Sequence, residues 1–250
     1  MESLPLFGTA YFGVRDPHHF RGDLRAIARA GYSWVLFPFT QDDASWERST
    51  FRELVGAAEE LGLTSVISPW GGDEFGGEGM QGRMTTVEWL ARAKATGATI
   101  LHIDEPRPKS MTLPRILDAW GDDAAVWLTI QPDRAWVVDH ETSGRLGALG
   151  TDAYDGDLEG RVAQTQAFER QTERLDLAWV QAFRIEPGDE RVVGDTVEAM
   201  AALATKVGIW GWKGSTGRGE LRSGRPARVE QEVQAAMARV RSGSSSVEAA

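Results

Sequence analysis

A short junction recurs along the chain, in which a helix-like segment ends at a glycine and a strand-like segment follows at once. Glycine at this position adopts the left-handed conformation that ends many helices. Repeated units of strand, helix and glycine are typical of parallel strands joined by right-handed helical crossovers. The junctions are centred on Gly31, Gly62, Gly97 and Gly208.

Eight short segments rich in apolar, β-branched and aromatic residues are predicted as buried parallel strands. They are residues 7–13, 33–39, 64–70, 99–104, 125–130, 148–154, 178–185 and 208–212. Stretches with apolar residues at i, i+3 and i+4 lie between most of them and are predicted as amphipathic helices. Examples are residues 20–30, 51–61, 86–96, 162–175 and 196–207.

Eight such units in 250 residues fit a (β/α)8 TIM barrel, a fold that needs about 250 residues. We therefore predict a single barrel domain over residues 1–241 and a disordered tail over residues 242–250. The fifth unit holds only a short helix candidate in residues 134–146, which predicts an irregular barrel there. A doubly wound open sheet is the alternative, but residues 13–16 do not form the glycine-rich turn that it would need after the first strand.

The amino-acid composition argues against several classes of binding partner and of reaction for such a domain. The chain has 27 Lys and Arg against 37 Asp and Glu, a net charge of −10, which argues against nucleic acid or an anionic membrane as its main partner. It has no cysteine, which excludes disulfides, thiolate catalysis and zinc–cysteine sites. Residues 1–10 lack the pattern of a secretory signal, and no apolar run is long enough to span a bilayer. We therefore expect a cytoplasmic protein, or a secreted one whose leader was removed.

Carboxylates, amides and aromatic rings gather at the carboxyl ends of the predicted strands, where barrels of this class carry their active sites. Carboxylate pairs serve in acid–base catalysis, and tryptophan faces offer flat apolar platforms to sugar rings. The combination predicts a carbohydrate substrate and a site without a cofactor or metal. The predicted substrate-binding residues are Trp70, His102, Gln131, Asp152, Tyr154, Asp155, Trp210 and Trp212.

The chain has ten tryptophans, and their positions predict a group in the core and a group on the active face. Trp34, Trp127 and Trp179 lie inside predicted strands and are expected in the core. A second group lies at strand ends or in loops on the expected active face: Trp46, Trp70, Trp136, Trp210 and Trp212.

The most specific motif is Ile103-Asp104-Glu105-Pro106 at the end of the fourth predicted strand. Two adjacent acids at a buried strand end are costly unless they are hydrogen-bonded or used in chemistry. Because side chains alternate along a strand, His102 and Asp104 share one face. The structural alternative is that Asp104 caps the loop backbone and Glu105 is a solvated acid on the rim.

Asp-Glu-Pro at the end of the fourth barrel strand resembles the retaining glycoside hydrolases, of which two groups compete. Similarity to the clan with Asn-Glu-Pro implies that Glu105 is the acid/base and that Glu186, in Ile185-Glu186-Pro187, is the nucleophile. Asp104 departs from that clan, whose Asn bonds the sugar 2-hydroxyl. Similarity to the N-acetylhexosaminidases with an Asp-Glu dyad implies that Glu105 is the acid. Asp104 would then orient a substrate acetamido group that acts as the nucleophile.

Tyr154-Asp155 on the sixth predicted strand and Trp210 and Trp212 on the eighth also resemble chitinase-like barrels. Those barrels carry Asp-x-Glu rather than adjacent acids.

Two other classes of function stay open. A metal-dependent or phosphate-binding sugar isomerase or aldolase would use His102, Glu105, Asp155 and Glu186 as metal ligands, or residues 213–219 as a phosphate cradle. A degenerate barrel that only binds carbohydrate is the non-enzymatic alternative.

Overall fold

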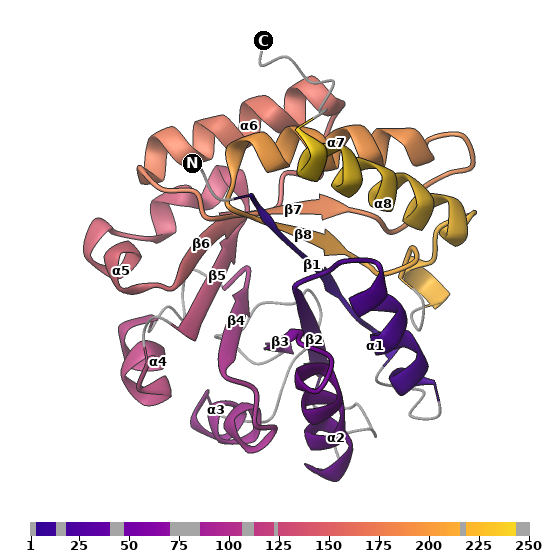
Figure 1. Cartoon of the computed structure of the whole chain (residues 1–250). Helices are drawn as coiled ribbons and strands as arrows, with labels where there is room; N and C mark the ends of the chain where they lie inside the picture. The colour runs from indigo at the N-terminus through magenta and orange to yellow at the C-terminus, as the bar shows by residue number, and fades with distance from the viewer. Residues whose placement is uncertain are drawn as a thin grey trace.

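The computed structural model describes residues 4–13, 19–40, 48–70, 86–106, 113–122, 125–215 and 219–243. Its strands are β1 (Leu6–Ala10), β2 (Trp34–Thr40), β3 (Thr64–Trp70), β4 (Ile100–Asp104), β5 (Val126–Ile130), β6 (Ala148–Thr151), β7 (Leu177–Gln181) and β8 (Lys206–Trp210). Each strand pairs in parallel with the next, and β8 pairs with β1, so the sheet closes into a barrel (Figure 1). The predicted (β/α)8 TIM barrel is confirmed. The doubly wound sheet is wrong, because an open sheet leaves two edge strands unpaired.

Helices lie around the strands and form the outer layer of the barrel (Figure 1). They are α1 (Phe20–Arg29), α2 (Arg48–Glu59), α3 (Thr86–Ala95), α4 (Leu113–Trp120), α5 (His140–Arg145), α6 (Leu158–Thr172), α7 (Glu190–Leu203) and α8 (Pro226–Ser242). In the fifth unit a 3₁₀ helix, η5 (Pro132–Val137), precedes the six-residue α5. The predicted irregularity of this unit is therefore confirmed. A second 3₁₀ helix, η6 (Gly219–Leu221), precedes α8.

The carboxyl end of α8 meets the predicted tail. The helix runs to Ser242, and Gly243 caps it with φ 69°. The rest of the predicted tail, residues 244–250, lies outside the described residues. Among the residues that the structure does describe, no helix is long and apolar enough to cross a membrane.

Three of the four predicted junction glycines have the expected backbone. Gly31, Gly62 and Gly97 have φ values of 88°, 76° and 87°, each between a helix and the next strand. Gly208 was assigned the wrong role, because α7 already ends at Leu203 and Gly208 lies inside β8. A Cβ atom at Gly208 would overlap the ring of Trp179, so this glycine provides room for an aromatic side chain inside the barrel.

Four tryptophans pack inside the barrel. The ring centres of Trp34 and Trp127 are 5.3 Å apart, those of Trp34 and Trp179 are 5.4 Å apart, and those of Trp179 and Trp210 are 4.9 Å apart. All three pairs are close to perpendicular, the edge-to-face arrangement that aromatic rings prefer. Gly8 leaves the space for Trp34, because a Cβ atom there would overlap the indole. The barrel centre is therefore a packed aromatic core, as expected for Trp34, Trp127 and Trp179.

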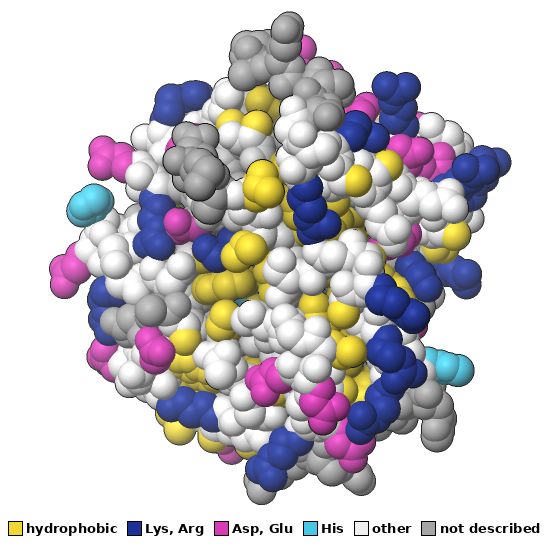
Figure 2. Space-filling view, viewed as in Figure 1, with side chains coloured by type: hydrophobic (Ala, Val, Ile, Leu, Met, Phe, Trp, Pro, Cys, Tyr) yellow, Lys and Arg dark blue, Asp and Glu magenta, His cyan; other side chains and the backbone are white. Residues whose placement is uncertain are grey.

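A larger apolar core lies between the strands and the helices, made by side chains of the opposite strand faces. Figure 2 shows basic and acidic side chains interspersed over one face of the molecule, with apolar side chains between them. The excess of acidic residues is thus not gathered on that face.

Candidate functional site

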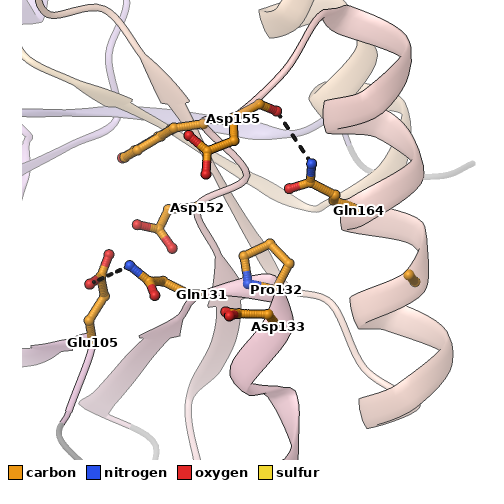
Figure 3. Close-up of a pocket in the computed structure, with 9 residues that line it drawn as sticks. Glu105, Gln131, Pro132, Asp133, Asp152, Asp155 and Gln164 are labelled. Carbon is orange, nitrogen blue, oxygen red and sulfur yellow. Dashed lines mark hydrogen bonds between the residues drawn. The ribbon is translucent and has the colours of Figure 1, made fainter.

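Three polar side chains follow three neighbouring strands of the barrel. Glu105 comes directly after β4, Gln131 after β5 and Asp152 after β6. Because parallel strands end at the same rim, these side chains converge on one pocket of about 530 Å³ (Figure 3). This volume lies within the usual range of small-molecule sites, roughly 300–1,000 Å³. The pocket is also lined by Pro132, Asp133, Tyr154, Asp155, Gln164 and Ala167.

The two walls of the pocket are set by local sequence. Pro132 starts η5, a position that suits proline because the first helical residue needs no N–H donor. Asp157 caps the start of α6 by accepting a hydrogen bond from the Gly160 N–H at 2.9 Å. Gln164, one to two turns further along α6, donates its side-chain amide to the Asp155 carbonyl oxygen at 3.3 Å. Pro132 thus sets where η5 begins, and the two hydrogen bonds hold the start of α6.

Glu105 has a strained backbone. Its φ is 42°, in the left-handed region that non-glycine residues adopt rarely and at a cost of about 1–3 kcal/mol. Two contacts hold it there: its N–H donates to the Thr129 carbonyl oxygen at 3.0 Å, and its Oε2 accepts from Gln131 Nε2 at 2.9 Å. Such strain at a strand end is typical of residues whose side chain must point in a set direction.

Asp152 forms a carboxyl pair with Glu105. Its side chain is 8 % exposed, and its Oδ1 is buried without a hydrogen-bond donor among the described residues. Burial raises the pKa of Asp152 well above its usual range, and the hydrogen bond with Glu105 and the charges of Glu105 and Asp104 raise it further. A negative charge close to Asp152 disfavours its ionised form, so Asp152 holds its proton to a higher pH than an ordinary aspartate.

Tyr154 adds a neutral hydroxyl to the same pocket. Burial raises its pKa well above 10, and the charges of Asp152, Asp104 and Glu105 raise it further. Its ring packs edge-to-face on Phe183, with ring centres 5.7 Å apart. The phenol therefore stays protonated and acts as a hydrogen-bond donor beside the acids.

Five of the predicted site residues meet in this pocket: Glu105, Gln131, Asp152, Tyr154 and Asp155. Asp104, the last residue of β4, is close enough for its charge to act on Asp152 and Tyr154. Trp70 is the last residue of β3, and its side chain lies outside the described part of the chain.

Glu186 does not line the pocket. The sequence pattern predicted a seventh strand that runs to Ile185, whereas β7 ends at Gln181. Glu186 is exposed on the loop that follows, where the Ile185 N–H donates to Ser223 Oγ at 3.1 Å and ties that loop to the segment before α8. The predicted position of Glu186 at a strand end is therefore wrong.

His102 lies one layer deeper than the pocket. Its ring is fully buried, with Nδ1 at 3.0 Å from Ser68 Oγ and Nε2 at 2.8 Å from Thr129 Oγ1. Burial lowers the pKa of His102 to about 3, so the imidazole is neutral. Both ring nitrogens are used inside the barrel, which makes His102 a core residue rather than a residue that touches a ligand.

Trp210 and Trp212 are also core residues. Trp210 is 7 % exposed and packs on Trp179, while Trp212 is 2 % exposed. The Trp212 ring lies 6.0 Å from that of Tyr11, and Lys213 Nζ covers it at 4.2 Å from the ring centre. The expectation that both rings stand on the rim is corrected: neither has an open face.

Gln164 and Ala167 were not predicted, because they come from a helix and carry no motif. The pairing of Asp152 with Glu105 was missed as well, since β5 lies between their strands. Within the described ranges, no group of three or more His, Asp or Glu side chains is placed to hold a metal ion.

The fold and this rim pocket define a (β/α)8 TIM barrel with an acidic site at the ends of β4, β5 and β6. No protein-family model matches the chain, and no curated protein matches it by sequence.

Solved structures with similar folds include hydrolases and synthases. GH5_18 from Streptomyces cattleya in complex with GlcNAc is 17 % identical with a TM-score of 0.63, over 99 % of this chain and 83 % of that one. The N-acetylneuraminic acid synthetase from Leptospira borgpetersenii is 12 % identical with a TM-score of 0.62, over 100 % and 87 %. The exo-β-1,4-mannosidase Op5Man5 from an Opitutaceae bacterium is 12 % identical with a TM-score of 0.66, over 96 % and 59 %. Identities this low show the fold alone.

Proposed function

We propose that the chain is a glycoside hydrolase in which Glu105 protonates the glycosidic oxygen of an oligo- or polysaccharide. The observation that carries this proposal is that Glu105 and Asp152 line one pocket of about 530 Å³, in which burial and the neighbouring Glu105 raise the pKa of Asp152. Cleavage of a glycosidic bond requires a carboxylic acid that can donate a proton, and a neighbouring carboxyl with a raised pKa provides a proton at this site. Two of the similar folds reported above belong to carbohydrate-active proteins, which fits a sugar substrate.

The two carboxyls have different parts in this proposal. Glu105 is half-buried whereas Asp152 is almost fully buried, so Glu105 is the one that meets the sugar. Glu105 gives its proton to the leaving oxygen as the bond from that oxygen to the anomeric carbon breaks. The acetamido oxygen of the substrate bonds the anomeric carbon as the leaving oxygen departs. A water molecule then adds to the anomeric carbon, which breaks the bond to the acetamido oxygen, and the water returns one proton to Glu105. Asp152, whose pKa is raised by burial, holds a proton beside Glu105 between turnovers.

A substrate acetamido group is the nucleophile that we propose. Glu186 is on an exposed loop and does not line the pocket, so we do not assign it the nucleophilic role. Asp104 would instead orient the acetamido group, and the neutral Tyr154 hydroxyl would donate a hydrogen bond to it. GH5_18 was solved with GlcNAc, a sugar that carries this group, which is consistent with the choice.

The rival classes predict different ligands. A sugar aldolase or phosphate-binding isomerase would take an anionic substrate, which the acidic side chains Glu105, Asp133 and Asp155 of the pocket disfavour. Of the predicted phosphate cradle, residues 216–218 lie outside the described residues. A non-catalytic barrel would bind the same sugars without turnover.

Kinetics on a panel of aryl glycosides, with and without the N-acetyl group, tests the proposal. Glu105→Gln should lower kcat on an N-acetylhexosaminide by about 10²–10⁴-fold, whereas Glu186→Gln, the matched control, should leave it unchanged. Full activity of Glu105→Gln would overturn the assignment. Loss of activity in Glu186→Gln would overturn the acetamido route, and activity that disappears on chelation would favour the metal-dependent class.

A further inference from the structure

Trp136 is the exception among the tryptophans. Its side chain is 64 % exposed, whereas every other tryptophan with a described side chain is at most 7 % exposed. Most of the indole is therefore open to solvent, which distinguishes Trp136 from the tryptophans of the core.

Trp136 belongs to a segment whose first residues line the pocket. The segment is η5, and these first residues are Pro132 and Asp133. Trp136 follows Pro132 by four residues and Asp133 by three, so it lies close to the pocket wall along the chain. A bend at Arg134, with φ −110° and ψ 15°, divides η5, so Pro132 and Asp133 stand before the bend and Trp136 after it. Ala135, the residue before it, is 2 % exposed and anchors η5 to the core.

We propose that Trp136 is an outer sugar-binding platform, on which a pyranose ring of the substrate stacks beyond the sugar held in the pocket. This inference rests on the proposed function, because it assigns the platform to the same carbohydrate. The indole offers a flat apolar face to the C–H face of a sugar ring. Asp133, exposed on the same short helix, supplies a carboxylate acceptor for the hydroxyls at the edge of that ring.

A comparison of substrates of two lengths tests the platform. With the aryl monoglycoside that the enzyme cleaves, Trp136→Ala should keep kcat and KM, since one sugar fills only the pocket. With a tetrasaccharide of the same sugar, Trp136→Ala should raise KM about tenfold and leave kcat unchanged. Val87→Ala, which shortens another exposed apolar side chain, on α3, is the matched control and should change neither. Equal KM effects on both lengths, or none on the tetrasaccharide, would overturn the platform.

Tryptophan fluorescence separates this inference from the proposed function. The Glu105→Gln variant, titrated with the tetrasaccharide, should show an emission change that the Glu105→Gln/Trp136→Phe variant lacks. If that change is seen and no variant cleaves any glycoside, the platform stands and the hydrolase assignment fails. If the sugar is cleaved and the change persists in the double variant, the hydrolase stands and the platform is wrong.

Discussion

The backbone N–H of Glu105 donates a hydrogen bond to the carbonyl oxygen of Thr129, across the ends of β4 and β5, at 3.0 Å. The Thr129 hydroxyl accepts from Trp179 Nε1 at 2.8 Å and lies 2.8 Å from His102 Nε2. The acid that we propose as proton donor is thus held by a residue that the buried core itself fixes. This arrangement explains how the left-handed backbone of Glu105 persists.

The first prediction concerns that backbone. Glu105→Ala removes the carboxyl and keeps the strain, whereas Glu105→Gly removes both, because glycine adopts φ 42° without a steric cost. We expect the glycine variant to be more stable than the alanine variant by about 1 kcal/mol, measured as the free energy of unfolding in urea.

Glu173 provides the control for this comparison. It ends α6 with φ 54° and is exposed, so its side chain has no part in the pocket. Glu173→Gly should likewise exceed Glu173→Ala in stability by about 1 kcal/mol. Equal stabilities of the two variants at position 105, with the expected difference at 173, would show that Glu105 is not strained.

The second prediction concerns the buried acid Asp152. Its pKa is raised in the fold, so the folded state holds a proton that the unfolded state releases. The fold therefore loses stability as pH rises from the ordinary pKa of Asp towards the raised value. Asp152→Asn removes the ionisable group and should raise Tm at pH 8, with each kcal/mol worth roughly 2–4 °C in a domain of this size. The gain should vanish near pH 4.

Asp133→Asn is the matched control, since Asp133 is an exposed acid of the same pocket. Its Tm should stay close to that of the unchanged protein at both pH values. A Tm gain for Asp152→Asn that is the same at pH 4 and pH 8 would contradict a buried, protonated Asp152.

The fold could be predicted because the sequence patterns that indicate each helix and strand lie within a few neighbouring residues. Helical periodicity and left-handed glycines mark each unit, and Gly31, Gly62 and Gly97 stand where the pattern placed them. The ends of strands are less certain, because an apolar residue in a loop resembles one in a strand. Ile185 therefore extended the predicted seventh strand past Gln181, and Glu186 was placed at the wrong position.

The site was predicted in part, for a related reason. Both faces of a barrel strand are apolar, so the pattern does not tell a rim tryptophan from an interior one, and Trp210 was assigned to the rim. Glu105 and Asp152 follow strands that are separated by β5, so their side chains meet across that strand end. The spacing of residues along the chain does not indicate such a contact. The motif at β4 did identify Glu105, since an acid after a buried strand is a local feature.

The third prediction concerns the neutral imidazole of His102. Its pKa is about 3 in the fold against 6.5 as the ordinary value, so below pH 6.5 the unfolded chain takes up a proton that the folded chain refuses. The free energy of unfolding that depends on the neutral His102 imidazole is fully present above pH 6.5 and is lost progressively as pH falls towards 3. The total is several kcal/mol, since each pKa unit corresponds to about 1.4 kcal/mol.

The measurement is the free energy of unfolding between pH 7 and pH 5, above the range where most carboxylates titrate. The Asp152→Asn variant is the right background, because Asp152 changes stability in the opposite direction over this range. His140→Gln is the control for removal of a histidine from the surface, since His140 is exposed. Nitrogen NMR shifts of a charged imidazole for His102 in the folded protein at pH 5 would contradict the prediction.

The last prediction concerns the space that glycines leave for the interior tryptophans. A Cβ atom at Gly8 would overlap the ring of Trp34, which Trp127 and Trp179 hold on either side. Gly8→Ala should therefore lower the free energy of unfolding by about 3 kcal/mol, and adding Trp34→Leu should recover part of that loss. Gly56→Ala is the control: a Cβ there meets nothing within 4 Å, so this helix substitution should stabilise by about 0.5–1 kcal/mol. If Gly8→Ala is as stable as Gly56→Ala, the barrel interior has room for an extra methyl group, and tight packing of Trp34 against Gly8 is wrong.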